Sequence, residues 1–224
     1  MTKLLKTALV SAAVAAGCWI APSVSAQSFG VQVNGVTCMD NTACDLDPTV
    51  GQITYLASVS GFSLALNSSL TNTPGSAAGS FIDMAWNILR TNTGGTLSIQ
   101  FLASATGFQF PANGSPGVLT NQLSGNSATG GVSGTGQAWI NSSNALFGTT
   151  GLTAGAQSIF GSTTSIQFTS ATPYSLTQEL DFGMGPSSQT SGDFATSVVP
   201  EPAPLALVAI ALAGLALVRR RTRS

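Results

Sequence analysis

Residues 53–64 read Ile53-Thr54-Tyr55-Leu56-Ala57-Ser58-Val59-Ser60-Gly61-Phe62-Ser63-Leu64 and carry the clearest secondary-structure signal in the chain. Apolar side chains occupy odd-numbered positions before Gly61 and even-numbered positions after it. Because an apolar residue at every second position is typical of a half-buried β-strand, both halves predict strand. A change of phase at a glycine predicts a β-bulge or a bend at that point.

The same pattern returns further along the chain. Residues 99–110 match residues 53–64 at six of twelve positions, and their apolar phase changes at Gly107. A weaker third copy begins at Ile166, is one residue shorter and keeps a single phase. The copies start 46 and 67 residues apart, and unequal spacing argues against a regular solenoid. Unless the repeat is chance similarity in a Ser/Thr-rich chain, long bent strands predict an all-β body, a β-sandwich or jelly-roll-like fold over residues 27–198.

Turn signals separate further predicted strands. Asn34-Gly35 lies between two valines and predicts a tight turn. Residues 82–88 alternate as a strand does, although a helix also fits their spacing, and residues 91–95 predict a hairpin loop into a strand at 96–105. Residues 125–136, rich in glycine and serine, predict a long loop.

Charge is scarce in the predicted body. Between Gln27 and Val199 the only base is Arg90 and there are seven acids, and one minus seven gives a net charge of −6. The chain contains no histidine, which excludes a Ser-His-Asp triad, a Cys-His dyad and a histidine-ligated metal site. No basic surface is left to neutralise phosphates, so we expect no nucleic-acid partner. Nothing in the sequence indicates a cofactor.

The N-terminus has the three parts of a secretory signal peptide. Lys3 and Lys6 form a basic region, Leu9–Ile20 is mostly apolar, and Val24-Ser25-Ala26 is a small-residue cleavage site. We therefore predict that signal peptidase removes residues 1–26. An ordinary buried helix is the alternative interpretation.

A competing cleavage site lies inside this segment. Ala15-Ala16-Gly17-Cys18 approximates a lipobox, with Cys18 as the acyl acceptor. Ala15 stands where that pattern has leucine or another large aliphatic residue. The sequence therefore leaves open whether Cys18 is lipidated.

The C-terminus also has three parts. Val199-Pro200-Glu201-Pro202 is followed by the uncharged residues 203–218 and then by Arg219, Arg220, Arg221 and Arg223. Residues 203–218 predict a single transmembrane helix, somewhat shorter than the roughly 20 residues that span a bilayer comfortably. Because arginines hold their end of a membrane helix in the cytoplasm, the body before Pro200 is expected on the outer side.

This ending, residues 199–224, resembles the PEP-CTERM sorting signal. Pro200, Glu201 and Pro202 match the Pro-Glu-Pro of that family, and the apolar helix and arginine cluster follow in the family's order. The resemblance implies a Gram-negative exporter in which an exosortase cuts near the motif. It also implies a precursor held transiently in the inner membrane and a mature form at the cell surface or outside the cell. The resemblance does not extend to the body, and a plain C-terminal membrane anchor is the alternative.

Two cysteines and three aspartates lie close together in the body. Cys38 and Cys44 are its only cysteines, and in an exported protein we expect them to form a disulfide. Asp40, Asp45 and Asp47 supply carboxylates at a density that suits Ca²⁺, although their spacing matches no calcium loop. A solvated acidic turn is the simpler interpretation, and we predict no metal site.

Three further residues suggest contact with a carbohydrate. Glu179 and Asp181 are two residues apart, so a strand presents both carboxylates on one face. They resemble the Glu-x-Asp-x-x-Glu strand of one jelly-roll glycosidase family, but Met184 stands in the third position. Trp139 lies out of phase with its apolar neighbours, and an outward-facing ring is suited to stacking on a sugar.

These features predict an exported, exosortase-sorted protein of the cell surface or extracellular matrix, associated with exopolysaccharide or a biofilm. Before the sorting motif the predicted body has no lysine, one arginine and one glutamate, so acid–base and nucleophilic options are few and we expect no catalysis. Two alternatives stay open. One is a carbohydrate-binding or glycosidase-like module built on Trp139, Glu179 and Asp181, and the other is an adhesin or structural matrix subunit.

Overall fold

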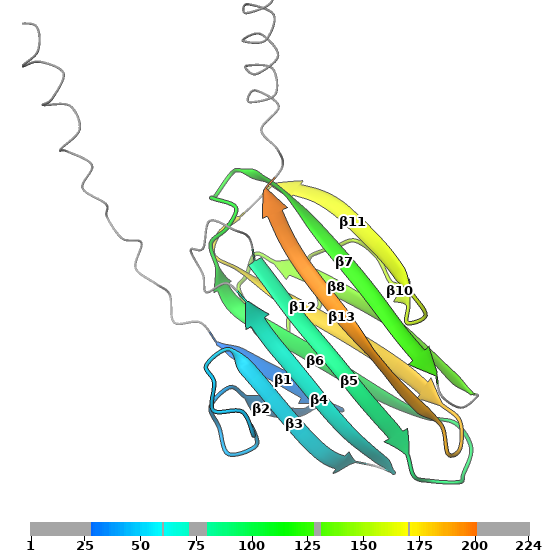
Figure 1. The fold of residues 1–224 in the computed structure, drawn as a ribbon. Coiled ribbons are helices and arrows are strands. Elements are labelled where there is room, and N and C mark those ends of the chain that lie inside the picture. Colours follow the sequence, from blue (N-terminus) through cyan, green and yellow to red (C-terminus); the bar gives the residue numbers. More distant parts are fainter. Residues whose placement is uncertain (1–27, 60, 72–79, 128–130, 170, 201–224) are drawn as a thin grey trace, which may run out of the picture.

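The described part of the chain forms thirteen β-strands in two antiparallel sheets (Figure 1). The structure is a computed structural model that describes residues 28–59, 61–71, 80–127, 131–169 and 171–200. Its regular elements are all strands, and the two sheets form a sandwich, as the alternating pattern predicted. Within these ranges there is no helix long and apolar enough to cross a membrane.

Sheet A has seven strands in the order β10-β8-β12-β6-β1-β2, with β9 paired to β8. Its strands are β1 (Phe29–Val33), β2 (Val36–Met39), β6 (Leu97–Phe108), β8 (Val132–Asn141), β9 (Leu152–Thr153), β10 (Gln157–Ser158) and β12 (Tyr174–Met184). Sheet B has six strands in the order β11-β7-β13-β5-β4-β3. Its strands are β3 (Gln52–Val59), β4 (Phe62–Thr71), β5 (Ser80–Arg90), β7 (Pro116–Ser127), β11 (Ser162–Thr169) and β13 (Gln189–Pro200).

The core lies between the sheets, where every second residue of each central strand points inward. Trp86 of β5 in sheet B contacts Phe182 of β12 in sheet A, with ring centroids 5.5 Å apart, and Phe182 also contacts Phe101. All three side chains are at least 97% buried. Since the inward positions are filled this way, the remaining positions of each strand form the two outer faces of the sandwich.

The first two copies of the repeat take different structures. At Gly61 the predicted bulge or bend within one strand is wrong: β3 and β4 are two strands of a hairpin, with Val59 paired to Phe62. A two-residue turn also exchanges odd for even positions, which explains the change of phase. At Gly107 the bulge is confirmed, because the register between β6 and β12 shifts there and Gly107 has φ +82°. Both glycines have positive φ, a conformation that other residues rarely adopt.

Of three connections predicted from short stretches of sequence, one is confirmed and two are wrong. Asn34 and Gly35 form the predicted tight turn between β1 and β2, with Val33 paired to Val36. Residues 91–95 connect two predicted strands, but the hairpin is wrong because β5 and β6 lie in different sheets. The long loop predicted over 125–136 is also wrong, since most of that range belongs to β7 and β8.

The ends of the chain bracket this body. The sandwich begins at β1 and ends at β13, which pairs with β7 as far as Pro200. Val199 and Pro200, the first residues of the predicted tail, are therefore the last residues of a central strand. The predicted signal peptide, Cys18, the apolar residues 203–218 and the terminal arginines lie outside the described residues.

Candidate functional site

The outer face of sheet A contains the predicted carboxylates. Glu179 and Asp181 are outward-facing residues of β12, the third strand in the order of the sheet. β8 places Thr135 opposite Asp181, and β6 places Gln100 opposite it on the other side. The alternation of the strand thus brings both carboxylates to one face, as the sequence predicted.

Glu179 has an unusual environment for a surface carboxylate. Gln100 Nε2 donates a hydrogen bond to Glu179 Oε1 at 2.6 Å, which favours the ionised form. Partial burial, and next the negative charge of Asp181, raise the pKa of Glu179 above its ordinary value. Glu179 therefore holds its proton to a higher pH than an ordinary glutamate does.

A shallow hollow of about 630 Å³ lies beside this pair. Gly183 of β12 also lines the hollow, and a Cβ atom at this position would lie 3.0 Å from Ser133 Oγ. Apolar surface, with Ile99 and Phe182 among the lining residues, alternates with hydroxyl and amide groups and one carboxylate. The polar side chains of the lining are Asn34, Ser98, Gln100, Ser133, Thr135 and Asp181. This arrangement offers hydrogen-bond donors and acceptors to a polar, uncharged ligand.

Trp139 faces the same side but does not offer its ring to solvent. It lies opposite Thr177 of β12 and Thr153 of β9, and it is only 9% exposed. The segment between β8 and β9 lies over this part of the face, where the Phe147 amide donates to Ser104 Oγ at 2.9 Å. The structure therefore places Trp139 near the carboxylates without making it a stacking surface.

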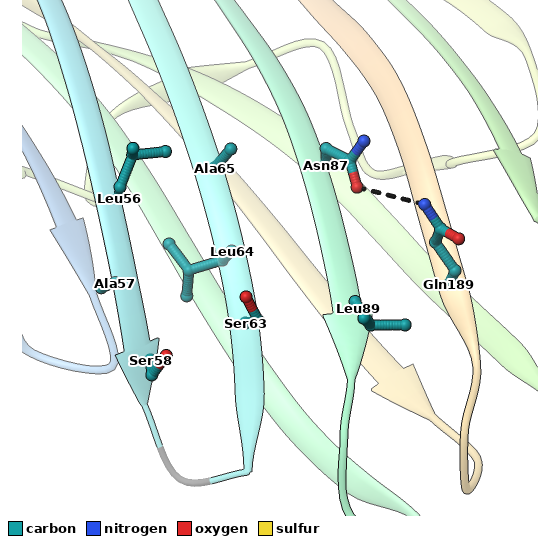
Figure 2. Close-up of a pocket in the computed structure, with 9 residues that line it drawn as sticks. All are labelled: Leu56, Ala57, Ser58, Ser63, Leu64, Ala65, Asn87, Leu89 and Gln189. Atoms are coloured by element: carbon teal, nitrogen blue, oxygen red, sulfur yellow. Dashed lines mark hydrogen bonds between the residues drawn. The ribbon is translucent and has the colours of Figure 1, made fainter.

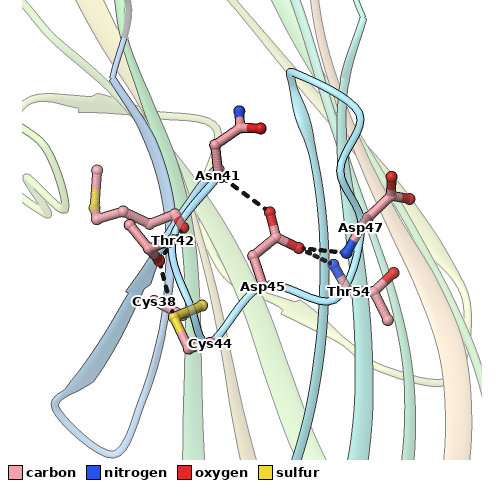
Figure 3. The surroundings of a disulfide bond; sticks show 8 residues. Cys38, Asn41, Thr42, Cys44, Asp45, Asp47 and Thr54 are labelled. Atoms are coloured by element: carbon pink, nitrogen blue, oxygen red, sulfur yellow. Dashed lines mark hydrogen bonds between the residues drawn. A yellow bond between two sulfur atoms is a disulfide. The ribbon is translucent and has the colours of Figure 1, made fainter.

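The predicted disulfide links β2, which contains Cys38, to the loop that joins β2 to β3, which contains Cys44 (Figure 3). Cys38 and Cys44 are bonded, with their Cα atoms 5.8 Å apart. Asp45 Oδ2 accepts the amide of Asn41 at 3.1 Å, and its Oδ1 accepts the amides of Asp47 at 2.9 Å and Thr54 at 3.0 Å. The disulfide is confirmed, and the main contacts of Asp45 are with backbone amides.

The other two aspartates of this loop also bond to the backbone. Asp47 Oδ1 accepts the amide of Thr49 at 2.9 Å, and Asp40 Oδ2 accepts the amide of Gly51 at 2.8 Å. In the part of the chain that the structure describes, no three acidic, cysteine or histidine side chains form a group that suits a metal ion. One oxygen of each carboxylate thus contacts a backbone amide of the loop itself or of the start of β3.

Sequence reasoning missed a second carboxylate pair on the outer face of sheet B. Asp83 of β5 lies opposite Ala195 of β13, and Asp193 of β13 lies opposite Ala85, so the two acids are diagonal neighbours. Burial, followed by the charge of Asp193, raises the pKa of Asp83 to about 6. The two residues are 110 positions apart in the chain, and only the pairing of β5 with β13 reveals them.

Fold and C-terminus together define a β-sandwich followed immediately by a sorting tail. Residues 198–221 match the family model described as the PEP-CTERM protein-sorting motif. The chain thus carries an exosortase sorting signal, which indicates export to the cell envelope or surface. The match begins at Val198, inside β13, and leaves the rest of the body unassigned.

Other comparisons add little about the body. None of the curated proteins matches this chain. Among the solved structures that match is the isomalto-dextranase of Arthrobacter globiformis T6, complexed with panose, at 14% identity and a TM-score of 0.22. The match covers 78% of this chain and 30% of that chain. Similarity at this level carries no argument about fold or function.

Proposed function

We propose that the mature chain is a non-enzymatic protein of the cell surface or extracellular matrix that associates with exopolysaccharide. The observation that carries this proposal is the hollow on the outer face of sheet A, in a chain that its tail directs to the cell surface. Exopolysaccharide is a polymer abundant at that location. The proposal adds a binding partner to the location that the sorting motif indicates.

The lining of the hollow suits a neutral sugar chain. Sugar hydroxyls both donate and accept hydrogen bonds, as the amide of Gln100 and the hydroxyl of Thr135 do. Asp181 adds an acceptor that is stronger because it is charged. The described body presents no exposed cation, since Arg90 is buried, so a polyanionic chain is a poor fit.

A glycosidase-like activity is the second candidate, and the raised pKa of Glu179 favours it, since a general acid needs such a shift. Three features oppose it. Asp181 is close enough to Glu179 to raise its pKa, whereas the two carboxylates of a glycosidase stand on either side of the bond that they cleave. The hollow is shallow and excludes little water, and the ring of Trp139 is covered. We therefore expect that the wild-type body does not hydrolyse sugars and that the Glu179→Gln variant behaves in the same way.

The processing route completes the proposal. Signal peptidase removes residues 1–26, and residues 203–218 then hold the precursor in the inner membrane with the arginines in the cytoplasm. Sixteen residues of helix span about 24 Å, less than the roughly 30 Å of hydrocarbon, which suits a transient stop. Exosortase cuts near Pro200–Pro202 and releases the body from its tail.

The test is binding of the exported body to the host's own exopolysaccharide, measured by affinity electrophoresis. We expect retention by wild type and at least tenfold weaker retention by Asp181→Asn. The matched control is Asp193→Asn, which makes the same change on the opposite outer face and should bind as wild type does. Absence of retention, or equal loss in both variants, would contradict the proposal.

A further inference from the structure

One lateral edge of sheet B is formed by β3, which pairs with β4 on one side and with no described strand on the other. An edge strand presents backbone amides and carbonyls to solvent, and natural proteins protect such edges with charges, prolines or covering loops. β3, residues Gln52–Val59, contains neither a charged residue nor a proline. Any protection of this edge must therefore come from another part of the molecule.

A loop protects the first half of the edge. The Thr54 amide donates to Asp45 Oδ1 at 3.0 Å, and the Thr54 carbonyl accepts the Leu46 amide at 2.9 Å. Alternate residues of an antiparallel strand direct their backbone groups to the same side, so Leu56 and Ser58 point the way Thr54 does. Among the described residues, nothing bonds to their edge-facing groups. The edge is therefore open at Leu56 and Ser58.

An exposed apolar side chain lies at this opening. Leu56 is 57% exposed and borders a hollow of about 550 Å³ on the outer face of sheet B (Figure 2). Ala65 and Leu89 also line the hollow, and Gln189 Nε2 donates to Asn87 Oδ1 across it at 3.4 Å. A strand added beside β3 would cover Leu56 and would extend this hollow beyond the present edge of the sheet.

The undescribed segments between the strands of the body are too short to reach the opening. The longest is residues 72–79, which joins Thr71 to Ser80. Ala65, the partner of Leu56, lies six residues before Thr71 on β4, about 20 Å away. Eight residues that must return to their starting end reach no further than about 14 Å. Once residues 1–26 and the tail have been removed, an occupant of the opening therefore belongs to another molecule.

We propose that this molecule is a second copy of the chain, paired through β3 about a two-fold axis at Ala57. In this register Leu56 of each copy lies opposite Ser58 of the other. Each such pair exchanges two backbone hydrogen bonds, so both open residues are satisfied by four new bonds. No charge lies on either strand to oppose the contact. The product is one continuous sheet of twelve strands, six from each copy.

The proposal concerns the mature body and so rests on the proposed removal of both ends. It does not involve polysaccharide, because β3 lies in sheet B and the hollow proposed to bind sugar lies on sheet A. The body, residues 27–200, contains every strand of both sheets and the whole core, so it folds as a unit. Its self-association can be measured without any carbohydrate present, and either proposal can fail without the other.

The first experiment is sedimentation velocity over a range of protein concentrations. We expect a reversible dimer for wild type, and at least tenfold weaker dimerisation for Leu56→Lys, because the two lysines become diagonal neighbours about 7–8 Å apart. The matched control is Phe160→Lys, which places the same charge at a side chain that is 52% exposed in the turn before β11. This control should dimerise as wild type does.

A second variant tests the register. On the axis the two Ala57 residues form a non-hydrogen-bonded pair with Cα atoms about 4.5 Å apart, within the range of a disulfide. Ala57→Cys should therefore give a covalent dimer on oxidation, and adding Leu56→Lys should abolish it. A monomer at every concentration, or a dimer that Leu56→Lys does not weaken and Ala57→Cys does not cross-link, would overturn the proposal. Pairing of β3 with a foreign strand while the protein alone stays monomeric would also overturn it.

Discussion

The arginine of the body and the arginines of the tail differ in their role. Arg90 contacts the backbone of the sandwich, whereas the arginines of the tail belong to a sorting motif. In the body, Arg90 is 1% exposed and donates to the carbonyls of Met184, Gly94 and Gly95, which join the end of β12 to the loop after β5. In the tail, Arg219–Arg221 lie in the segment that matches a sorting motif. The tail therefore specifies where the protein goes, and the body has to be interpreted from its own geometry. Changes in one region should leave the property of the other intact.

Replacement of Arg90 should have the largest effect on the body. Arg90→Met leaves the three carbonyls of Met184, Gly94 and Gly95 without their charged donor, and we expect the free energy of unfolding to fall by about 3 kcal/mol. Urea denaturation of the body measures this change. Arg90→Lys, which keeps the charge, should recover part of the loss. An unchanged midpoint for Arg90→Met would show that this contact does not stabilise the fold.

The disulfide should have the next largest effect. Cys38 and Cys44 close a short loop, and loop-closure entropy predicts that the double change to serine lowers stability by about 2 kcal/mol. The amide contacts of Asp45 should remain, so the loss should be confined to stability, with surface delivery unchanged. Thermal unfolding with and without reductant checks the prediction. If reductant lowers the melting temperature of the double variant as much as that of wild type, the disulfide is not the cause.

The smallest effect concerns the carboxylate pair of sheet B. Folding raises the pKa of Asp83 from 3.8 to about 6, so the folded state binds this proton more tightly than the unfolded state does. Protonation of Asp83 therefore stabilises the folded state below about pH 4, and this stabilisation is lost as the pH rises through 6. We expect Asp83→Asn to stabilise the body at pH 7.5 by about 1 kcal/mol, after allowance for solvent screening, and to flatten its pH dependence between 4 and 6. Parallel curves for Asp83→Asn and wild type would contradict this assignment.

Local patterns predicted the strands and the turns that depend on neighbouring residues. Asn34-Gly35 formed its turn because both residues tolerate positive φ, which is a property of the residues themselves. The phase change at Gly61 and Gly107 was also real. Its cause was not predictable, since a two-residue hairpin and a one-residue bulge both exchange odd and even positions.

Pairing between distant strands was beyond the sequence. The alternation of β12 was enough to place Glu179 and Asp181 on one face, because both lie on a single strand. Asp83 and Asp193 meet only because β13 lies beside β5, and Trp139 is covered only because β9 and its preceding segment fold over it. Sheet order and loop placement depend on the packing of the whole core, which no local pattern records.

The tail is a sorting signal, and we propose that it is cut from the exported body. One epitope tag inserted after Gly114, in the exposed turn between β6 and β7, and a second after Ser224 test this claim in the host cell. Surface material should keep the first tag and lack the second, and replacing Pro200, Glu201 and Pro202 by alanine should leave both tags in the membrane fraction. A mature protein that keeps both tags and stays in the inner membrane would show that the tail is only an anchor.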